Sequence, residues 1–126
     1  MNRLEDKVAI VTGATGGIGK ATVELFIKEG ANVLMVDLNE DDLIEVAKEI
    51  DSNKLSYFQG DVSSLLDNQR SVALAIERYG GLDIFIANAG IAGEIQPITE
   101  YDEETFDSVM AVNAKGPFLG LKAAIP

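Results

Sequence analysis

A glycine-rich segment, Thr12-Gly-Ala-Thr-Gly-Gly-Ile-Gly19, holds the residues with the clearest chemical potential in this chain. Gly13, Gly17 and Gly19 lack a Cβ, so the backbone can approach a ligand closely, and the unpaired amides of a helix start favour an anion. An apolar run ending at Val11 precedes the segment, and apolar residues at helical spacing follow it. A strand that turns through glycines into a helix predicts a site for the phosphates of a nucleotide.

An acidic residue lies where a dinucleotide site requires one. Asp37 ends a second apolar run, 18 residues after Gly19, close to the roughly 20 expected for the carboxylate that binds an adenosine ribose. An ordinary turn is the alternative for the glycines, and a turn cap is the alternative for Asp37. A nucleoside-triphosphate loop is disfavoured, because Lys20 is followed by Ala21 and not by the Ser or Thr that would hold magnesium.

The segment 12–19 resembles the TGxxxGxG signature of the short-chain dehydrogenase/reductases, and the similarity extends over essentially the whole chain. The resemblance implies NAD as the cofactor and hydride transfer to or from a small alcohol or ketone. It also implies that the chain is the first half of such an enzyme, truncated after the fourth strand and the following helix. The cofactor-binding residues that it implies are Gly13, Thr15, Gly17, Ile18, Gly19, Asp37, Leu38, Asp61, Val62, Asn88, Ala89 and Gly90.

Asp37 is the residue that bears on the choice between NAD and NADP. The family resemblance implies that its carboxylate accepts hydrogen bonds from both ribose hydroxyls, whereas a 2′-phosphate would meet a like charge. Neither the glycine turn nor Leu38 supplies a basic residue that would offset this repulsion. We therefore expect NAD to be preferred.

Two later motifs extend the resemblance. Asp61-Val62 is similar to the dipeptide that contacts adenine in the family, with the Asp side chain on the exocyclic amine and the Val packed on the ring. A turn or cap residue is the alternative for this Asp. Asn88-Ala89-Gly90 resembles the last three residues of the family's NNAG motif, and Ala87 replaces the first Asn without touching the backbone turn.

The catalytic residues of the family are matched only in part. Asn113 resembles the helix Asn of the catalytic tetrad, which helps to hold a water in a proton relay; satisfying a helix kink near Pro117 is the alternative. The Ser and the YxxxK pair of the tetrad find no match, because Tyr57, Tyr79 and Tyr101 are followed four residues later by Asp61, Asp83 and Thr105. We expect a cofactor cradle that has no dehydrogenase activity by itself.

Two further classes of function stay open. The chain could be a functional unit of its own, as a non-catalytic nucleotide-binding or interaction module. A Rossmann-like methyltransferase also uses an acid after its second strand, although the spacing of the glycines argues against that class.

Composition excludes several kinds of chemistry and partner. The 126 residues suit one dinucleotide-binding domain, and a net charge of −11 offers no general attraction to nucleic acid or an anionic membrane. With no cysteine and no histidine, the chain has neither disulfides nor a Ser-His-Asp triad, and we expect no metal site. No apolar run approaches the roughly 20 residues that span a bilayer, and the polar start has no signal core, so we expect a cytoplasmic protein.

Alternating strands and helices predict how these residues are positioned. Strands are expected near residues 8–11, 32–37, 55–60 and 82–87, and helices over 17–29, after Asn39, after Ser63 or Ser64, and from Thr99 or Asp102. Such a chain forms an α/β, Rossmann-like doubly wound parallel sheet with strand order 3-2-1-4, and the nucleotide lies over the carboxyl ends of the strands.

The sequence also predicts how the third and last helices pack. The inner face of the third helix is expected to consist of Leu65, Gln69, Val72, Ala73 and Ile76. Gly116-Pro117 predicts a kink in the last helix, because an interior proline removes a hydrogen bond and costs about 3 kcal/mol. The apolar residues 118–125 need covering, and in the family a fifth strand pairs with the fourth, so we expect a homo-oligomer or other self-association.

Overall fold

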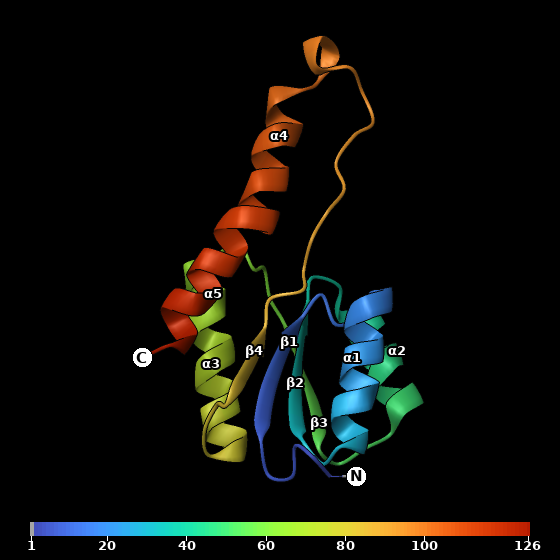
Figure 1. Cartoon of the computed structure of the whole chain (residues 1–126), viewed down its shortest axis with the longest axis vertical. Coiled ribbons are helices and arrows are strands. Elements are labelled where there is room, and N and C mark those ends of the chain that lie inside the picture. The colour runs from blue at the N-terminus through green and yellow to red at the C-terminus, as the bar shows by residue number, and fades with distance from the viewer. Residues whose placement is uncertain (1) are drawn as a thin grey trace.

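The computed structural model describes residues 2–126 and shows strands alternating with helices (Figure 1). The first six elements are β1 (Val8–Thr12), α1 (Gly17–Lys28), β2 (Asn32–Asp37), α2 (Glu40–Ile50), β3 (Leu55–Gln59) and α3 (Leu65–Tyr79). They are followed by β4 (Ile84–Ile86), the 3₁₀ turn η1 (Ile98–Glu100), α4 (Glu103–Met110), the π-helical segment η2 (Ala111–Lys115) and α5 (Gly116–Ala124). The bounds of β1, α1, β2 and β3 agree with the predicted ones within one residue.

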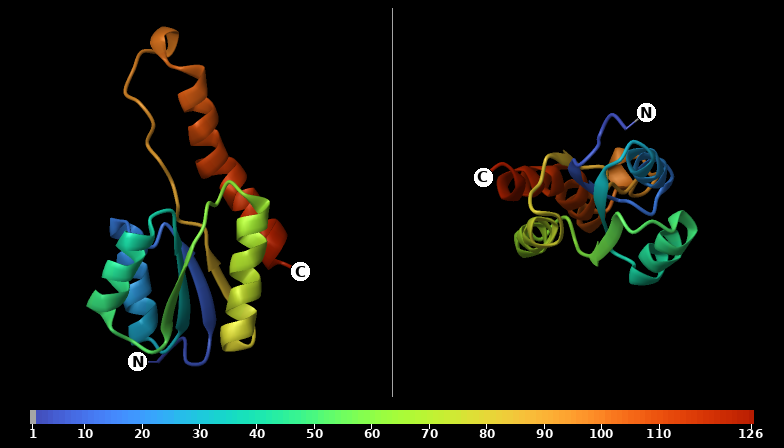
Figure 2. Two further views of the ribbon diagram at one scale, coloured as in Figure 1. Left: turned by 180° about the vertical axis from the view of Figure 1, so that it is seen from behind. Right: turned by 90° about the horizontal axis from the view of Figure 1, so that it is seen from below.

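The four strands form one parallel sheet in the order β3-β2-β1-β4, which confirms the predicted fold. Helices α1 and α2 cover one face, and α3 and α5 cover the other (Figure 2). This is the doubly wound arrangement, in which ligands bind where the chain changes direction between β1 and β4.

Side chains of β1 alternate between the two faces. Ala9 and Val11 pack in the core beneath α1 and α2, whereas Val8 and Ile10 pack in the core beneath α3. All five residues of the strand are buried. The continuous apolar run in the sequence therefore reflects a central strand that is covered on both sides.

Three helices begin at the side-chain caps that the sequence predicts. The side chains of Asn39, Ser64 and Asp102 each accept a hydrogen bond from a backbone amide in the first turn of α2, α3 and α4, respectively. Such a cap satisfies one of the amides that have no partner within the helix. The choice between Ser63 and Ser64, and between Thr99 and Asp102, is thereby settled.

The buried face of α3 differs from the predicted one. Three of the predicted residues are exposed: Gln69, Ala73 and Ile76. The residues that are buried are Asn68, Ser71, Val72 and Ala75. Asn68 and Ser71 can be buried because the Asn68 amide donates to two backbone carbonyls and the Ser71 hydroxyl donates to the Asn68 carbonyl. The sequence prediction holds for Val72 but misses Asn68 and Ser71, because residue types and spacing do not show the hydrogen bonds that allow these polar side chains to be buried.

Strand β4 is shorter than the predicted 82–87. The backbone amide of Asp83 donates to the Val8 carbonyl at 2.9 Å, and the Asp83 carboxylate accepts from the Val8 amide at 2.9 Å. A side chain thus takes the position that a strand carbonyl would otherwise occupy, and the strand begins at Ile84, two residues later than predicted. At the other end the Asn88 amide turns back onto the carbonyl of the last strand residue.

The chain does not break before Pro117. The Gly116 amide donates to the carbonyl of Ala111, five residues back, which makes 111–115 a π-helical segment between α4 and α5. Pro117 lies in the first turn of α5, directly after this segment. The irregularity predicted at Gly116-Pro117 thus includes a wider turn just upstream of the proline, and a turn of this kind often marks functional sites.

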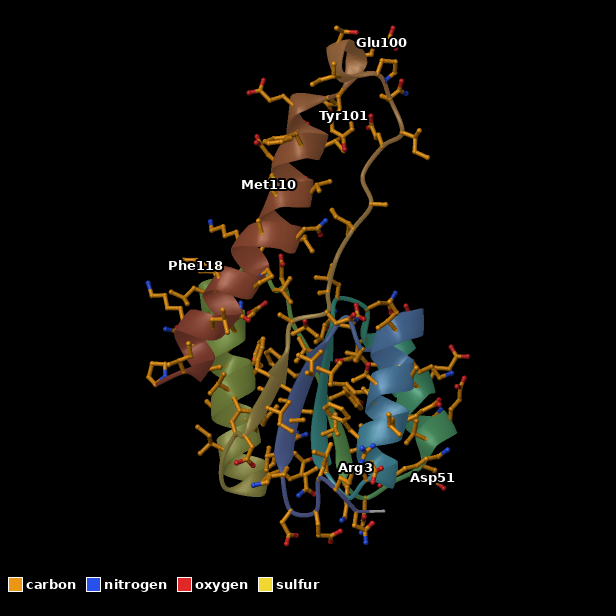
Figure 3. The ribbon with its side chains drawn as sticks, viewed as in Figure 1. Arg3, Asp51, Glu100, Tyr101, Met110 and Phe118 are labelled. Carbon is orange, nitrogen blue, oxygen red and sulfur yellow. The ribbon has the colours of Figure 1, made fainter. Side chains whose placement is uncertain are left out.

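Residues 91–115, here called the arm, extend away from the sheet (Figure 1). Figure 3 shows Glu100 and Tyr101 at the end farthest from Arg3 and Asp51. The arm does not fold over the open edge of β4, and neither α4 nor η2 contains a buried residue. Among the described residues, no helix combines the length and the hydropathy needed to cross a bilayer.

Candidate cofactor site

A pocket of about 580 Å³ lies over the carboxyl ends of the strands. Its walls come from the glycine-rich turn after β1, the end of β2, the turn after β3, the segment after β4 and one residue of η2. The lining residues are Gly13, Thr15, Gly16, Gly17, Ile18, Val36, Asp37, Leu38, Gly60, Asp61, Val62, Asn88, Ala89, Gly90, Ile91 and Val112. The structure thus brings every predicted cofactor residue except Gly19 to one cavity.

Two glycines of the turn are required by packing. Gly13 has a φ of +63°, and a Cβ there would lie 2.8 Å from the Cα of Ala89. A Cβ on Gly19 would lie 2.1 Å from the Gly13 carbonyl oxygen, so this residue holds α1 against the turn instead of lining the pocket. Gly17 differs from both, because a Cβ there would meet nothing within 4 Å. Its face of the turn is open to a ligand.

The start of α1 offers backbone amides to an anion. Gly16 is the N-cap and has no side chain that could bond the first amides, and the first turn contains no acidic residue. Unpaired amides and the helix dipole together favour a negatively charged group at such a start. The geometry suits a phosphate next to the open face of Gly17.

The Asp37 carboxylate is held at both oxygens. Its Oδ2 accepts from the Thr15 amide at 3.1 Å and from the Thr15 hydroxyl at 2.7 Å, and its Oδ1 accepts from the Leu38 amide at 2.7 Å. A carboxylate offers about four acceptor positions, so these three bonds fix its orientation and leave room for a further donor. The carboxylate therefore links the glycine-rich turn to the end of β2.

The pocket contains two carboxylates and no cationic side chain. Asp37 and Asp61 line it, and none of its lining residues is a lysine or an arginine. Lys20, although it follows the glycine turn directly, donates to Glu49 on α2, and this bond raises the pKa of Lys20. Within residues 2–126, no group of three acidic side chains is placed to hold a metal ion.

Asp61 begins a tight turn after β3. Its Oδ1 accepts from the Ser63 amide at 2.8 Å and from the Ser63 hydroxyl at 2.6 Å. The turn role that the sequence left open is therefore present in the structure. It does not exclude binding, because Oδ2 accepts no hydrogen bond from the described residues and Asp61 lines the pocket.

Thr12 joins the ends of β1 and β4. Its buried hydroxyl accepts from the amides of Asn88 at 3.0 Å and Ala89 at 3.1 Å, and the Asn88 side chain donates to the Gly13 carbonyl at 3.2 Å. The replacement of the preceding Asn by Ala87 leaves this set of bonds in place. Thr12 was not among the predicted site residues, although its position at the end of a strand and before a glycine could have indicated it.

Asn113 lies beside the pocket, on η2. Its side chain pairs with the backbone of Ile91 in both directions, with Oδ1 accepting from the amide and Nδ2 donating to the carbonyl at 2.8 Å each. The amide therefore fixes the start of the arm and does not satisfy the helix near Pro117. Its predicted place in a proton relay is not tested by these contacts.

Five lining residues were missed by sequence reasoning: Gly16, Val36, Gly60, Ile91 and Val112. Gly16, Val36 and Gly60 are direct neighbours of predicted residues, so the strand ends themselves were the available signal. Ile91 and Val112 reach the pocket only because the Asn113 side chain ties η2 to the segment after β4. Ile91 follows the predicted Gly90 and Val112 precedes the predicted Asn113, but residue types and spacing do not indicate the contact that brings the two segments together.

With this geometry established, comparison with known proteins identifies the family. The chain matches the family described as short chain dehydrogenase over residues 7–126, and it belongs to that family. It is 44% identical to short chain aldehyde dehydrogenase 1 of Euphorbia lathyris, covering 97% of this chain and 43% of the relative. It is 38% identical to momilactone A synthase of Oryza sativa subsp. japonica, covering 97% and 45%.

A solved structure agrees with the fold as well as with the sequence. The 3-ketoacyl-(acyl-carrier-protein) reductase from Brucella melitensis, complexed with NADH, superimposes with a TM-score of 0.93 at 35% identity. The match covers 98% of this chain and 50% of that one. The chain therefore spans about half the length of the relatives that it matches.

Proposed function

We propose that this chain is the NAD(H)-binding portion of an oxidoreductase that transfers hydride between NAD and an alcohol or ketone. The observation that carries the proposal is the lining of the pocket, where an open glycine turn and a helix start lie next to Asp37 and no cation is present. Phosphates fit the amides, and ribose hydroxyls fit a carboxylate. The additional 2′-phosphate of NADP would face two carboxylates without a compensating charge.

Different residues of the pocket bind different parts of the cofactor. The turn formed by Gly13, Gly17 and Gly19, with the start of α1, binds the pyrophosphate, and Asp37 binds the adenosine ribose beside Leu38. The dipeptide Asp61-Val62 binds adenine. The remaining pocket residues, which complete the binding surface, are Thr15, Ile18, Asn88, Ala89 and Gly90. When bound, NAD supplies the group that accepts or donates hydride.

Catalysis needs more than this cradle. Asn113 is proposed as the member of the family's proton relay that this chain contains, and it keeps the segment at Ile91 in place. The family's Ser and YxxxK pair, which would move the alcohol proton, are not found in the 126 residues. On this proposal the chain alone binds cofactor without turning over substrate. A homo-oligomer and a cytoplasmic location remain sequence-based predictions.

A second candidate is a non-catalytic nucleotide-binding module. The pocket described above would serve such a module as well. Both candidates require the same pocket, so cofactor binding is the property to test first.

Fluorescence titration with NADH and NADPH tests the proposal directly. We expect the unmutated chain to bind NADH about tenfold or more tightly than NADPH, as like-charge repulsion of somewhat more than 1 kcal/mol would give. Asp37→Ala is expected to narrow this difference. Asp41→Ala, which removes the same charge from an exposed position on α2, is the matched control and leaves the preference intact. Tighter binding of NADPH by the unmutated chain would contradict the proposal.

A further inference from the structure

The turn after β3 is hydrogen-bonded to residues at the start of α3. The Asp61 amide donates to the Asp67 carboxylate at 2.9 Å, and the Ser64 hydroxyl accepts from the Asp67 amide at 3.2 Å. These bonds are only partly buried. Asn68, a buried residue of α3, makes a further contact to the turn.

Asn68 is 4% exposed, and both hydrogens of its side-chain amide are used. Nδ2 donates to the carbonyl of Val62 and to the carbonyl of Ser64, each at 2.9 Å. Two carbonyls two residues apart are thereby drawn to a single nitrogen. The shape of the backbone from Val62 to Ser64 therefore depends on this amide, and the Asp61 carboxylate is joined to the same turn through its bonds from Ser63.

Val62 is also confined from the opposite side. A Cβ on Gly116, at the start of α5, would lie 3.0 Å from Val62 Cγ2. The side chain therefore lies between the helix and the pocket that it lines, with little space to withdraw. The position of Val62 is set by Asn68 through its carbonyl and by α5 through its methyl groups.

From these contacts we infer that Asn68 is a positioning residue for recognition of the adenine ring. This inference rests on the proposed function, in which Asp61-Val62 binds adenine, and adds a buried side chain that does not line the pocket. Ser63 occupies Oδ1 of Asp61, so Oδ2 is the oxygen available to the exocyclic amine. The position of Oδ2 depends on the shape of the turn, and the shape of the turn depends on the hydrogen bonds from Asn68.

Replacing Asn68 disturbs the turn in predictable ways. In Asn68→Asp, carboxylate oxygens face two carbonyl oxygens where N–H groups now donate, so the turn is pushed away from α3. In Asn68→Leu, the Val62 carbonyl loses its donor inside the protein, whereas the Ser64 carbonyl still accepts from the backbone amide of residue 68 at 3.1 Å. Both changes shift Val62 and the carboxylate of Asp61 relative to the pocket.

The test compares NADH with reduced nicotinamide hypoxanthine dinucleotide, in which an oxygen replaces the exocyclic amine of adenine. Fluorescence titration of the 126-residue chain yields the ratio of the two dissociation constants. We expect a ratio of about ten or more for the unmutated chain, as for one hydrogen bond to a charged group. Asn68→Asp and Asn68→Leu are expected to reduce it below about three. Ser71→Ala, which alters another buried polar residue of α3 without touching the turn, is expected to keep the ratio.

Circular dichroism at the titration temperature establishes whether each variant is folded. If an Asn68 variant is unfolded, it is replaced by Asn68→Ser, a milder change whose side chain is too short to bond both carbonyls. An unchanged ratio in a folded Asn68 variant overturns the inference, because lost stability alone would not alter preference between two ligands. Equal binding of both dinucleotides by the unmutated chain also overturns it, while leaving the proposed function standing. Failure to bind NADH at all overturns both.

Discussion

The sheet with its covering helices and the arm are both rich in apolar residues, yet only the first buries them. Every residue of β1 is buried, whereas α4 and η2 contain no buried residue and Phe106 and Met110 remain exposed. In the first region both faces of the sheet find partners within the described chain, although the outer side of α5 and the edge of β4 do not. In the second, the apolar residues are presented outward. Alternating apolar strands and helices are therefore enough to predict the core of the sheet region, whereas the apolar residues of the arm have no such core within the described chain.

The largest expected effect comes from the tightest contact of the sheet region. In Gly19→Ala, the new Cβ would lie only 2.1 Å from the carbonyl oxygen of Gly13. Neither backbone segment can move away without moving the turn. Overpacking of this kind costs about 1–3 kcal/mol or more, so we expect Tm to fall by at least about 5 °C and NADH binding to be lost. Thermal unfolding and titration measure both quantities.

Gly17→Ala is the matched control for that change, because its Cβ meets nothing within 4 Å. It should leave Tm unchanged or slightly raised, since alanine is the better helix former. If Gly19→Ala unfolds at the same temperature as the unmutated chain, the rigid packing of this turn is refuted.

The second prediction concerns the open surfaces. Three apolar residues of the last helical turns are largely exposed: Phe118, Leu121 and Ile125. The outer edge of β4 pairs with no strand of the described chain. We expect self-association at micromolar concentration, visible by light scattering, because unpaired strand edges and apolar patches favour contact between copies.

One double variant locates the contact. Phe118→Ser with Ile125→Ser reduces scattering if α5 is the surface, and scattering that persists in this double variant assigns the contact to the edge of β4. A stable monomer of the unmutated chain at the same concentration would show that neither α5 nor the edge of β4 mediates self-association.

A smaller effect is expected where the two regions join. Asn113→Ala removes both hydrogen bonds to the Ile91 backbone, worth about 1 kcal/mol each at most in an exposed site. Hydrogen exchange at the Ile91 amide should accelerate about fivefold to thirtyfold, while Tm changes by no more than a few degrees. Asn113→Asp, which retains the acceptor for that amide, should show the smaller acceleration. A large fall in Tm would mean that the arm stabilises the sheet after all.

The smallest effect depends on pH. The backbone amide of Arg3, at 3.2 Å, and then its guanidinium hold the pKa of Glu29 below its usual value. Because the folded-state pKa is the lower one, this contribution to stability is complete above the unfolded-state pKa of about 4.3 and is lost as pH falls through the folded-state value. Urea unfolding midpoints at pH 6 and pH 3.5 should therefore differ less in Glu29→Gln than in the unmutated chain.

Glu24→Gln changes an exposed residue of α1, the helix that ends directly before Glu29. It is the control for the general effect of removing one negative charge. If both variants flatten the pH dependence equally, the contact with Arg3 contributes nothing specific.

The features that sequence predicted well are the local ones. The glycine turn follows from residue types within a few positions, and the caps at Asn39 and Ser64 follow from side chains that bond amides three residues ahead. The strand order follows from alternation of strands and helices. Each of these depends on spacing that a single sequence displays.

The features that sequence missed depend on distant contacts. Asn68 and Ser71 are buried because hydrogen bonds satisfy them, and hydropathy cannot show such bonds. Strand β4 begins late because the Asp83 side chain bonds Val8, 75 residues earlier. The π-helical segment before Pro117 is a change in backbone pairing that residue types do not indicate.

The hydroxyl of Thr12 has a further consequence for the pocket. By accepting from two amides of the segment after β4, it keeps the ends of β1 and β4 at a fixed separation before any ligand arrives. A site that is already ordered loses little conformational entropy on binding, so more of the interaction energy appears as affinity. Preorganisation of this part of the pocket thus resides in one buried oxygen atom at the end of a strand.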